Sequence, residues 1–155
     1  MTKILLSLHV LAAILAVGPV TVAASMFPGT LRRTARDRDG TRTTLQTLHR
    51  ICKVYAGIGI AVPIFGLATA SSLGVLGDAW LITSIVLTAT AAGVLILLIL
   101  PGQDRALTDT ASPAETPSLA HETASRLALA TGIFNLLWAT VTVLMIIRPG
   151  STTGA

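Results

Sequence analysis

The sequence predicts an all-α fold, a bundle of four transmembrane helices forming one membrane domain over residues 1–155, with both termini outside. Two features of the composition predict this fold: 52% of the residues are hydrophobic and only 12% are charged. A soluble domain carries about 25% charged residues to cover its surface. The third feature is that the apolar residues form long blocks instead of amphipathic periods, as in chains that face lipid.

The first apolar block covers residues 4–27 and contains only four polar side chains. A helix of this length spans about 36 Å, which exceeds the ~30 Å hydrocarbon core of a bilayer. We expect Pro28 and Gly29 to stop this helix. Pro19, deep within the span, predicts a kink, and a neighbouring helix or the Thr21 hydroxyl would satisfy the freed carbonyl. The kink is either a packing feature or a hinge.

The other blocks cover residues 52–73, 79–100 and 127–147, and in lipid each of them must be helical to satisfy its backbone groups. We expect Pro101 and Gly102 to end the third helix. Residues 101–124, with several acidic residues and two prolines, predict a flexible linker. Residues 41–48 can form a short interfacial helix that leads into the second span.

The distribution of lysine and arginine predicts the orientation. Nine of the eleven lie in or beside residues 28–51 and 101–126, and only Lys3 and Arg148 lie beyond the other span ends. Short basic loops stay in the cytoplasm. We therefore expect a multi-pass protein of the plasma membrane with cytoplasmic loops 28–51 and 101–126 and extracytoplasmic termini.

A cleaved signal peptide is the alternative interpretation of the first block. Lys3 supplies a charged start, and residues 22–24 before Ser25 resemble a cleavage site. Against cleavage, the apolar stretch exceeds the usual 7–15 residues, and cleavage would require export of the arginine cluster. We expect the block to remain as a span.

His9 is the ionisable side chain inside an apolar block. Because burying such a group in lipid is costly, it is a candidate functional residue. It can be a structural or interfacial histidine, a proton relay, or a haem or metal ligand. His49 and His121 lie on the opposite side of the expected membrane and cannot share a metal with His9. We therefore predict no metal site and no cofactor.

Small residues recur at helical spacing in three spans. In the second span they are Ala56, Gly59, Pro63, Gly66 and Ala70. The first span has Ala13, Ala16, Val20 and Ala24, and the fourth has Ala128 and Gly132. Small residues let membrane helices approach closely. We interpret these patterns as seams within the bundle; a homodimer surface and a substrate groove are the alternatives.

Two further features have simple structural explanations. Asn135 is the strongest polar group of the last two spans, and we expect it to face the bundle interior. The arginine-rich loop predicts lipid headgroup contact through Arg32, Arg33, Arg36 and Arg38. The lipid bilayer is thus one expected partner. The placement of the positive charge reflects topology, so we expect no nucleic acid partner.

The segment from Leu8 to Ser25, LHVLAAILAVGPVTVAAS, resembles an uncharacterised family of predicted bacterial integral membrane proteins. These are small four-helix proteins, frequent in actinobacteria, classed as a domain of unknown function. The resemblance implies a plasma-membrane location and no known reaction or ligand. His9, Gly18 and Pro19 match the family pattern and are candidate functional positions by that resemblance.

No nucleophile–base pair, carboxylate pair or phosphate-binding loop is visible, so we predict that the protein is not an enzyme. The favoured hypothesis is an accessory or scaffold protein that acts through helix–helix contacts with a membrane protein partner or in a homo-oligomer. The alternative is a small oligomeric transporter or channel. A haem- or metal-binding protein that uses His9 is the third hypothesis.

Overall fold

The structure, a computed structural model, describes residues 2–33, 38–110 and 117–150, which are almost entirely helical. In chain order the elements are α1 (Thr2–Arg33), α2 (Arg38–Ile58), α3 (Ala61–Leu73), α4 (Ala79–Val94), the π-helix η1 (Leu95–Ile99), α5 (Leu100–Asp109) and α6 (Pro117–Ile147). No strand occurs within these ranges.

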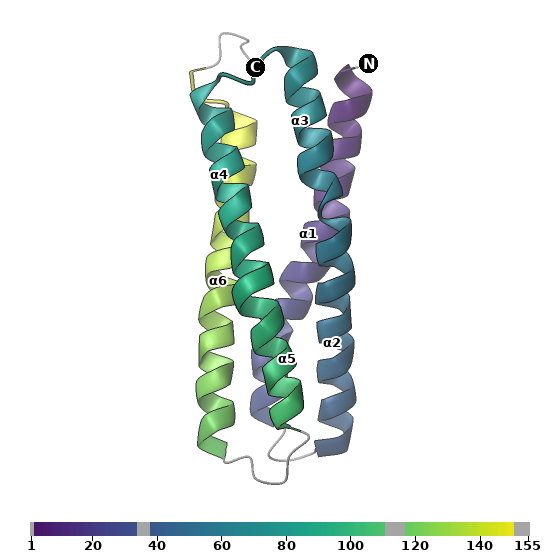
Figure 1. Cartoon of the computed structure of the whole chain (residues 1–155), viewed down its shortest axis with the longest axis vertical. Helices are drawn as coiled ribbons and strands as arrows, with labels where there is room; N and C mark the ends of the chain where they lie inside the picture. Colours follow the sequence, from purple (N-terminus) through teal and green to yellow (C-terminus); the bar gives the residue numbers. More distant parts are fainter. Residues whose placement is uncertain (1, 34–37, 111–116, 151–155) are drawn as a thin grey trace.

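The elements form four antiparallel rods: α1; α2 with α3; α4 with η1 and α5; and α6 (Figure 1). Each rod contains a helical segment of 29 to 34 residues, and each segment is long and apolar enough to cross a membrane. The predicted all-α fold with four spans is confirmed. α1 begins and α6 ends at one end of the bundle, the terminal end (Figure 1). At the other end, called here the arginine end, α1 and α5 end and α2 and α6 begin.

α1 continues through both of its prolines, so the expected stop at Pro28 and Gly29 is wrong. A proline inside a helix removes one donor and crowds a carbonyl, at a cost of about 3 kcal/mol. Pro28 is buried, and Leu31 in the next turn is only 1% exposed. Packing of this last segment against the other rods therefore outweighs the local cost of the proline.

The second rod is interrupted at Gly59 and Ile60, between α2 and α3. Pro63 has no N–H for the carbonyl of Gly59, four residues earlier. The N–H of Val62 donates to that carbonyl instead, at 3.1 Å, and makes a tighter turn. The sequence predicted one uninterrupted helix here, and the proline divides it.

The third rod continues past Pro101 and Gly102, so the expected helix end at these residues is wrong. The π-helix η1 directly precedes them and changes the register of the backbone hydrogen bonds. Pro101 then lies in the first turn of α5, where its missing N–H is tolerated. The expected flexible linker is helical at residues 101–109 and from residue 117 onward, and residues 111–116 lie outside the described residues.

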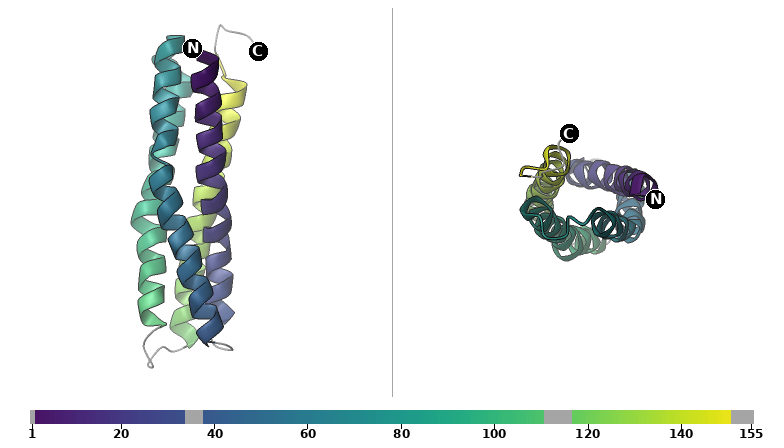
Figure 2. Two further views of the ribbon diagram at one scale, coloured as in Figure 1. Left: turned by 90° about the vertical axis from the view of Figure 1, so that its right-hand side faces the viewer. Right: turned by 90° about the horizontal axis from the view of Figure 1, so that it is seen from above.

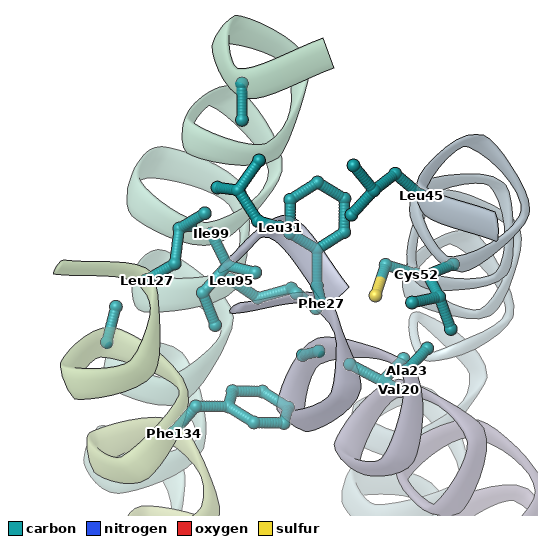
Figure 3. Packing of buried hydrophobic residues seen from close by; sticks show 14 of the residues in the cluster. Val20, Ala23, Phe27, Leu31, Leu45, Cys52, Leu95, Ile99, Leu127 and Phe134 are labelled. Atoms are coloured by element: carbon teal, nitrogen blue, oxygen red, sulfur yellow. The ribbon is translucent and has the colours of Figure 1, made fainter. Parts of the chain in front are cut away.

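A hydrophobic core fills the half of the bundle nearer the arginine end (Figure 3). Phe27, Leu45 and Ile99 come from three rods, meet there and are each 0% exposed. The fourth rod contributes Leu127 and Phe134. This half of the bundle is therefore packed like a protein interior.

The half nearer the terminal end is arranged differently. There α1 packs with α3, and α4 packs with α6, as two pairs (Figure 2). A separate, smaller cluster joins Ala70 of α3 to Trp80 and Leu81 of α4. Large apolar side chains cover the outer faces of all four rods; Leu97 and Leu136, for example, are 72% and 70% exposed. Such faces are compatible with lipid as the surrounding solvent.

Candidate functional site

The imidazole of His9 packs from α1 onto α3 in the half nearer the terminal end. Its Nδ1 lies 2.9 Å from the carbonyl oxygen of Val62. Because a carbonyl oxygen only accepts, Nδ1 is the donor in this hydrogen bond. The side chain is 8% exposed. This bond connects α1 to α3 directly beside the break in the second rod.

Gly66 of α3 makes room for this ring. A Cβ atom on Gly66 would lie 2.9 Å from Cε1 and 3.2 Å from Nδ1 of His9. Contacts this short are repulsive, so a larger residue at this position would force the imidazole to shift from its place on α3. The structure thus brings together two of the candidate residues, His9 and Gly66.

The other candidate residues of the second span do not join this site. Gly59 lies in the break between α2 and α3, and Pro63, which causes the break, is exposed. Ala70 is buried against Trp80. The small-residue pattern of this span therefore does not form one continuous seam.

Gly18 and Pro19 of α1 line a groove on the outside of the bundle, beside α2. The helix is continuous through both residues. The hydroxyl of Thr21, one of the two groups predicted to satisfy the carbonyl freed by Pro19, makes no hydrogen bond to a described residue. Gly18 and Pro19 thus help to form the groove and take part in no polar side-chain contact.

Asn135 of α6 makes a polar contact with α1. Its Nδ2 donates to Oγ of Ser25 at 3.2 Å, and one turn earlier Thr131 donates to the carbonyl of Ala24 at 3.5 Å. Oδ1 of Asn135 and Nε1 of Trp138 are buried and have no partner among the described residues. Unpaired polar atoms of this kind are rare in folded proteins, and each one costs about 1–3 kcal/mol.

Ala128 and Gly132 lie on an exposed face of α6, and a Cβ atom on Gly132 would meet no protein atom within 4 Å. The interpretation of this pair as a seam within the bundle is therefore wrong. Helical spacing identified the pair correctly but not the direction it faces, because that direction depends on where the other helices pack.

A buried polar network near the arginine end was missed by the sequence analysis. Oε1 of Gln103 lies 3.1 Å from Nδ1 of His49, and Nε2 of Gln103 donates to Sγ of Cys52 at 3.6 Å. Gln103 is 1% exposed and Cys52 is 0% exposed. Oδ1 of Asp104 lies 3.9 Å from Nε2 of His49. The spacing of His49 and Cys52 is a usable signal, but the composition around Gln103 predicts a linker and gives no sign of the contact.

Arg32 and Arg33 lie in the last turn of α1, at the arginine end. Arg32 donates to Oγ of Ser125 at 3.4 Å, and Arg33 is exposed. Arg36 and the side chain of Arg38, the other two expected headgroup contacts, lie outside the described residues. The lipid contacts of these arginines stay a prediction.

The histidines are distributed as the sequence predicts, with His49 and His121 in the half nearer the arginine end and His9 in the other half. Within residues 2–33, 38–110 and 117–150, no three His, Cys, Asp or Glu side chains are grouped closely enough to hold a metal ion. His9 is thus not accompanied by two further side chains of these types that could complete a metal site in this part of the chain.

Comparison with known proteins agrees with the membrane interpretation. Residues 3–149 match the family described as "Predicted integral membrane protein (DUF2269)". No curated protein and no solved structure matches the chain. The match covers nearly the whole sequence, including all four rods. The chain therefore belongs to this family of integral membrane proteins, whose function is unknown.

Proposed function

We propose that the protein is a non-enzymatic accessory or scaffold protein of a bacterial plasma membrane, which acts by packing α6 against another transmembrane helix. One observation carries the proposal. Ala128, Gly132 and Ala139 are all exposed, at spacings of four and seven residues that place them on one face of α6. We call these three residues the α6 small-residue face.

This face is suited to close helix packing. Lipid tails are as apolar as leucine, so association of membrane helices depends on van der Waals packing, which small residues improve. The open space above Gly132 is available to a neighbouring backbone. Neighbouring exposed positions of α6, such as Leu129 and Leu136, carry large side chains instead. The partner is therefore a helix of a second copy or of another membrane protein.

Asn135 also supports the proposal that the α6 small-residue face contacts a partner helix. It lies between Gly132 and Ala139 in sequence, at the edge of the α6 small-residue face, and its Oδ1 has no partner in the described chain. An interhelical hydrogen bond in a membrane contributes about 0.6–2 kcal/mol. A donor on the partner helix would pair this oxygen after rotation of the amide and would favour one orientation.

Gly132→Leu is expected to abolish the association, because its side chain fills the space that the partner backbone needs. The measurement is the copy number per particle in lipid nanodiscs, together with the amount of any stoichiometric membrane protein purified with the chain. The matched control is Gly57→Leu, since Gly57 is also an exposed helical glycine with open space above it. A wild-type chain without any stable protein partner, or equal association in both variants, contradicts the proposal.

We also propose extracytoplasmic termini. The support is that the arginine end carries Arg32, Arg33, Arg42, Arg50, Arg105 and Arg126, while Lys3 and Arg148 are the cations of the terminal end. Alkaline phosphatase fused after residue 155 is expected to be active, since the enzyme needs an oxidising compartment, and the same fusion after residue 112 is expected to be inactive. The reverse pattern would refute this orientation.

A further inference from the structure

A groove beside Gly18 and Pro19 is not explained by the α6 contact. It has a volume of about 460 Å³, within the ~300–1,000 Å³ typical of ligand sites. It lies between α1 and α2 and opens to the outside of the bundle. The residues that line it are Gly18, Pro19, Val22, Ala23, Met26, Leu48 and Ile51. All of these side chains are apolar, so the groove suits a hydrocarbon and offers nothing to a polar solute.

The groove exists because α1 carries little side-chain volume there. Gly18 has no Cβ, and a Cβ built on it would meet no protein atom within 4 Å. Val22 and Met26 follow at steps of four residues, so the three positions form a track along one face of α1. Both larger side chains are more than half exposed, at 58% and 53%. The track is thus open to the lipid over about two turns of α1.

A cation lies at the arginine end of this track. Arg33 follows Met26 by seven residues, which is two helical turns and about 10 Å along the axis. In a helix the Cα–Cβ bond tilts toward the N-terminus, so a long side chain at Arg33 can reach back along the face that carries Met26. Arg33 is exposed and makes no ion pair with a described side chain, whereas Arg32 is hydrogen-bonded to Ser125. Arg33 is therefore available to an anionic ligand.

The depth of these groups matches a lipid molecule. The apolar part of α1 ends near Phe27, so the groove lies within the hydrocarbon layer and Arg33 lies beyond it. The polar headgroup layer is roughly 5–7 Å thick on each side of the bilayer. A long arginine side chain can direct its charge into that layer while its stem stays along the helix.

We propose that the groove is a binding site for one phospholipid of the leaflet at the arginine end. One acyl chain lies along Gly18, Val22 and Met26, against Leu48 and Ile51, and the phosphate pairs with the guanidinium of Arg33. The apolar lining favours the acyl chain, and the guanidinium of Arg33 favours the phosphate. Gly18 and Pro19 are then the part of α1 that leaves room for the acyl chain.

The test uses the full-length protein in nanodiscs that contain a phosphatidylglycerol with a photoreactive diazirine on one acyl chain. Adducts are assigned to peptides by mass spectrometry. In the wild-type protein, adducts are expected on the groove-lining parts of α1 and α2. Gly18→Leu is expected to remove them because the new side chain fills the groove. Gly57→Leu, an equal change on another exposed surface, is expected to leave them unchanged.

A second pair of variants tests the headgroup. Arg33→Gln is expected to weaken binding of the lipid about fivefold, as loss of one cation near the surface predicts, and Arg105→Gln serves as the matched loss of charge.

If Gly18→Leu fails to fold, Met26→Trp provides a second way to fill the groove. Labelling that stays unchanged in the filled variants overturns the proposal. Equal labelling by a diazirine fatty acid without a phosphate also overturns it. Gly132→Leu is expected to keep the lipid adducts, so loss of helix association and loss of lipid binding are separable outcomes.

Discussion

Phe27→Ala is expected to lower the free energy of unfolding by about 3–5 kcal/mol, the usual cost of removing a fully buried phenylalanine. Phe27 is 0% exposed and lies in the middle of the core (Figure 3). Leu45 and Cys52 of α2 lie on one side of its ring, and Ile99 and Leu127 lie on the other. The substitution would leave a cavity between all four rods. Because four packed helices would have to move together to close this cavity, the structure can relax around it only in part.

Unfolding by denaturant in detergent micelles measures this loss. The matched control is Met26→Ala, the same truncation to alanine at the neighbouring position, because Met26 is 53% exposed on the outer face of the same helix. We expect the control to change stability by less than about 0.5 kcal/mol, as at most surface positions. Similar losses in the two variants would show that the core is not organised around Phe27.

Gly66→Ala is expected to destabilise the protein by about 1–3 kcal/mol, the usual cost of overpacking. The new Cβ would lie 2.9 Å from Cε1 of His9. The ring cannot simply move away, because its Nδ1 is bonded to the carbonyl of Val62 at 2.9 Å. Either the clash remains or the hydrogen bond breaks, and both outcomes raise the free energy of the folded state.

A double-mutant cycle with His9→Ala distinguishes this mechanism from an effect on the helix alone. With the imidazole removed, Gly66→Ala is expected to be neutral or stabilising, because alanine is favoured over glycine in helices by about 0.5–1 kcal/mol. The same unfolding measurement gives all four corners of the cycle. A loss at Gly66 that persists in the His9→Ala background would show that the two residues are not coupled.

The four spans could be predicted from the sequence because they depend on local composition. Transfer of an apolar segment into lipid is nearly additive over its residues, and backbone bonding within each segment forces a helix. The helix ends were harder to predict. Pro28 and Pro101 carry the same stop signal as prolines at many helix ends, but one is buried in the core and the other follows a π-helix. Local propensity was overridden by packing at both positions.

The candidate site was only partly predictable. His9 was identified by its cost in lipid, and Gly66 by its spacing, yet nothing in either signal indicated that the two residues touch. The exposed direction of Gly132 was missed for the same reason. The network of His49, Gln103 and Cys52 joins positions that are 51 to 54 residues apart, and no local pattern contains such a contact.

The sequence alone identifies this chain as a four-helix membrane protein, with eight of its nine arginines in or beside the two connections at one end. The preference of each residue for lipid or water depends on its own side chain. These preferences can therefore be summed along the sequence without knowing which helices pack together. The packing of the helices decides which face of each helix is covered, which carbonyl accepts the hydrogen bond from His9, and where a groove opens beside Gly18. These features depend on distances between helices, and close packing makes such distances a property of the whole bundle.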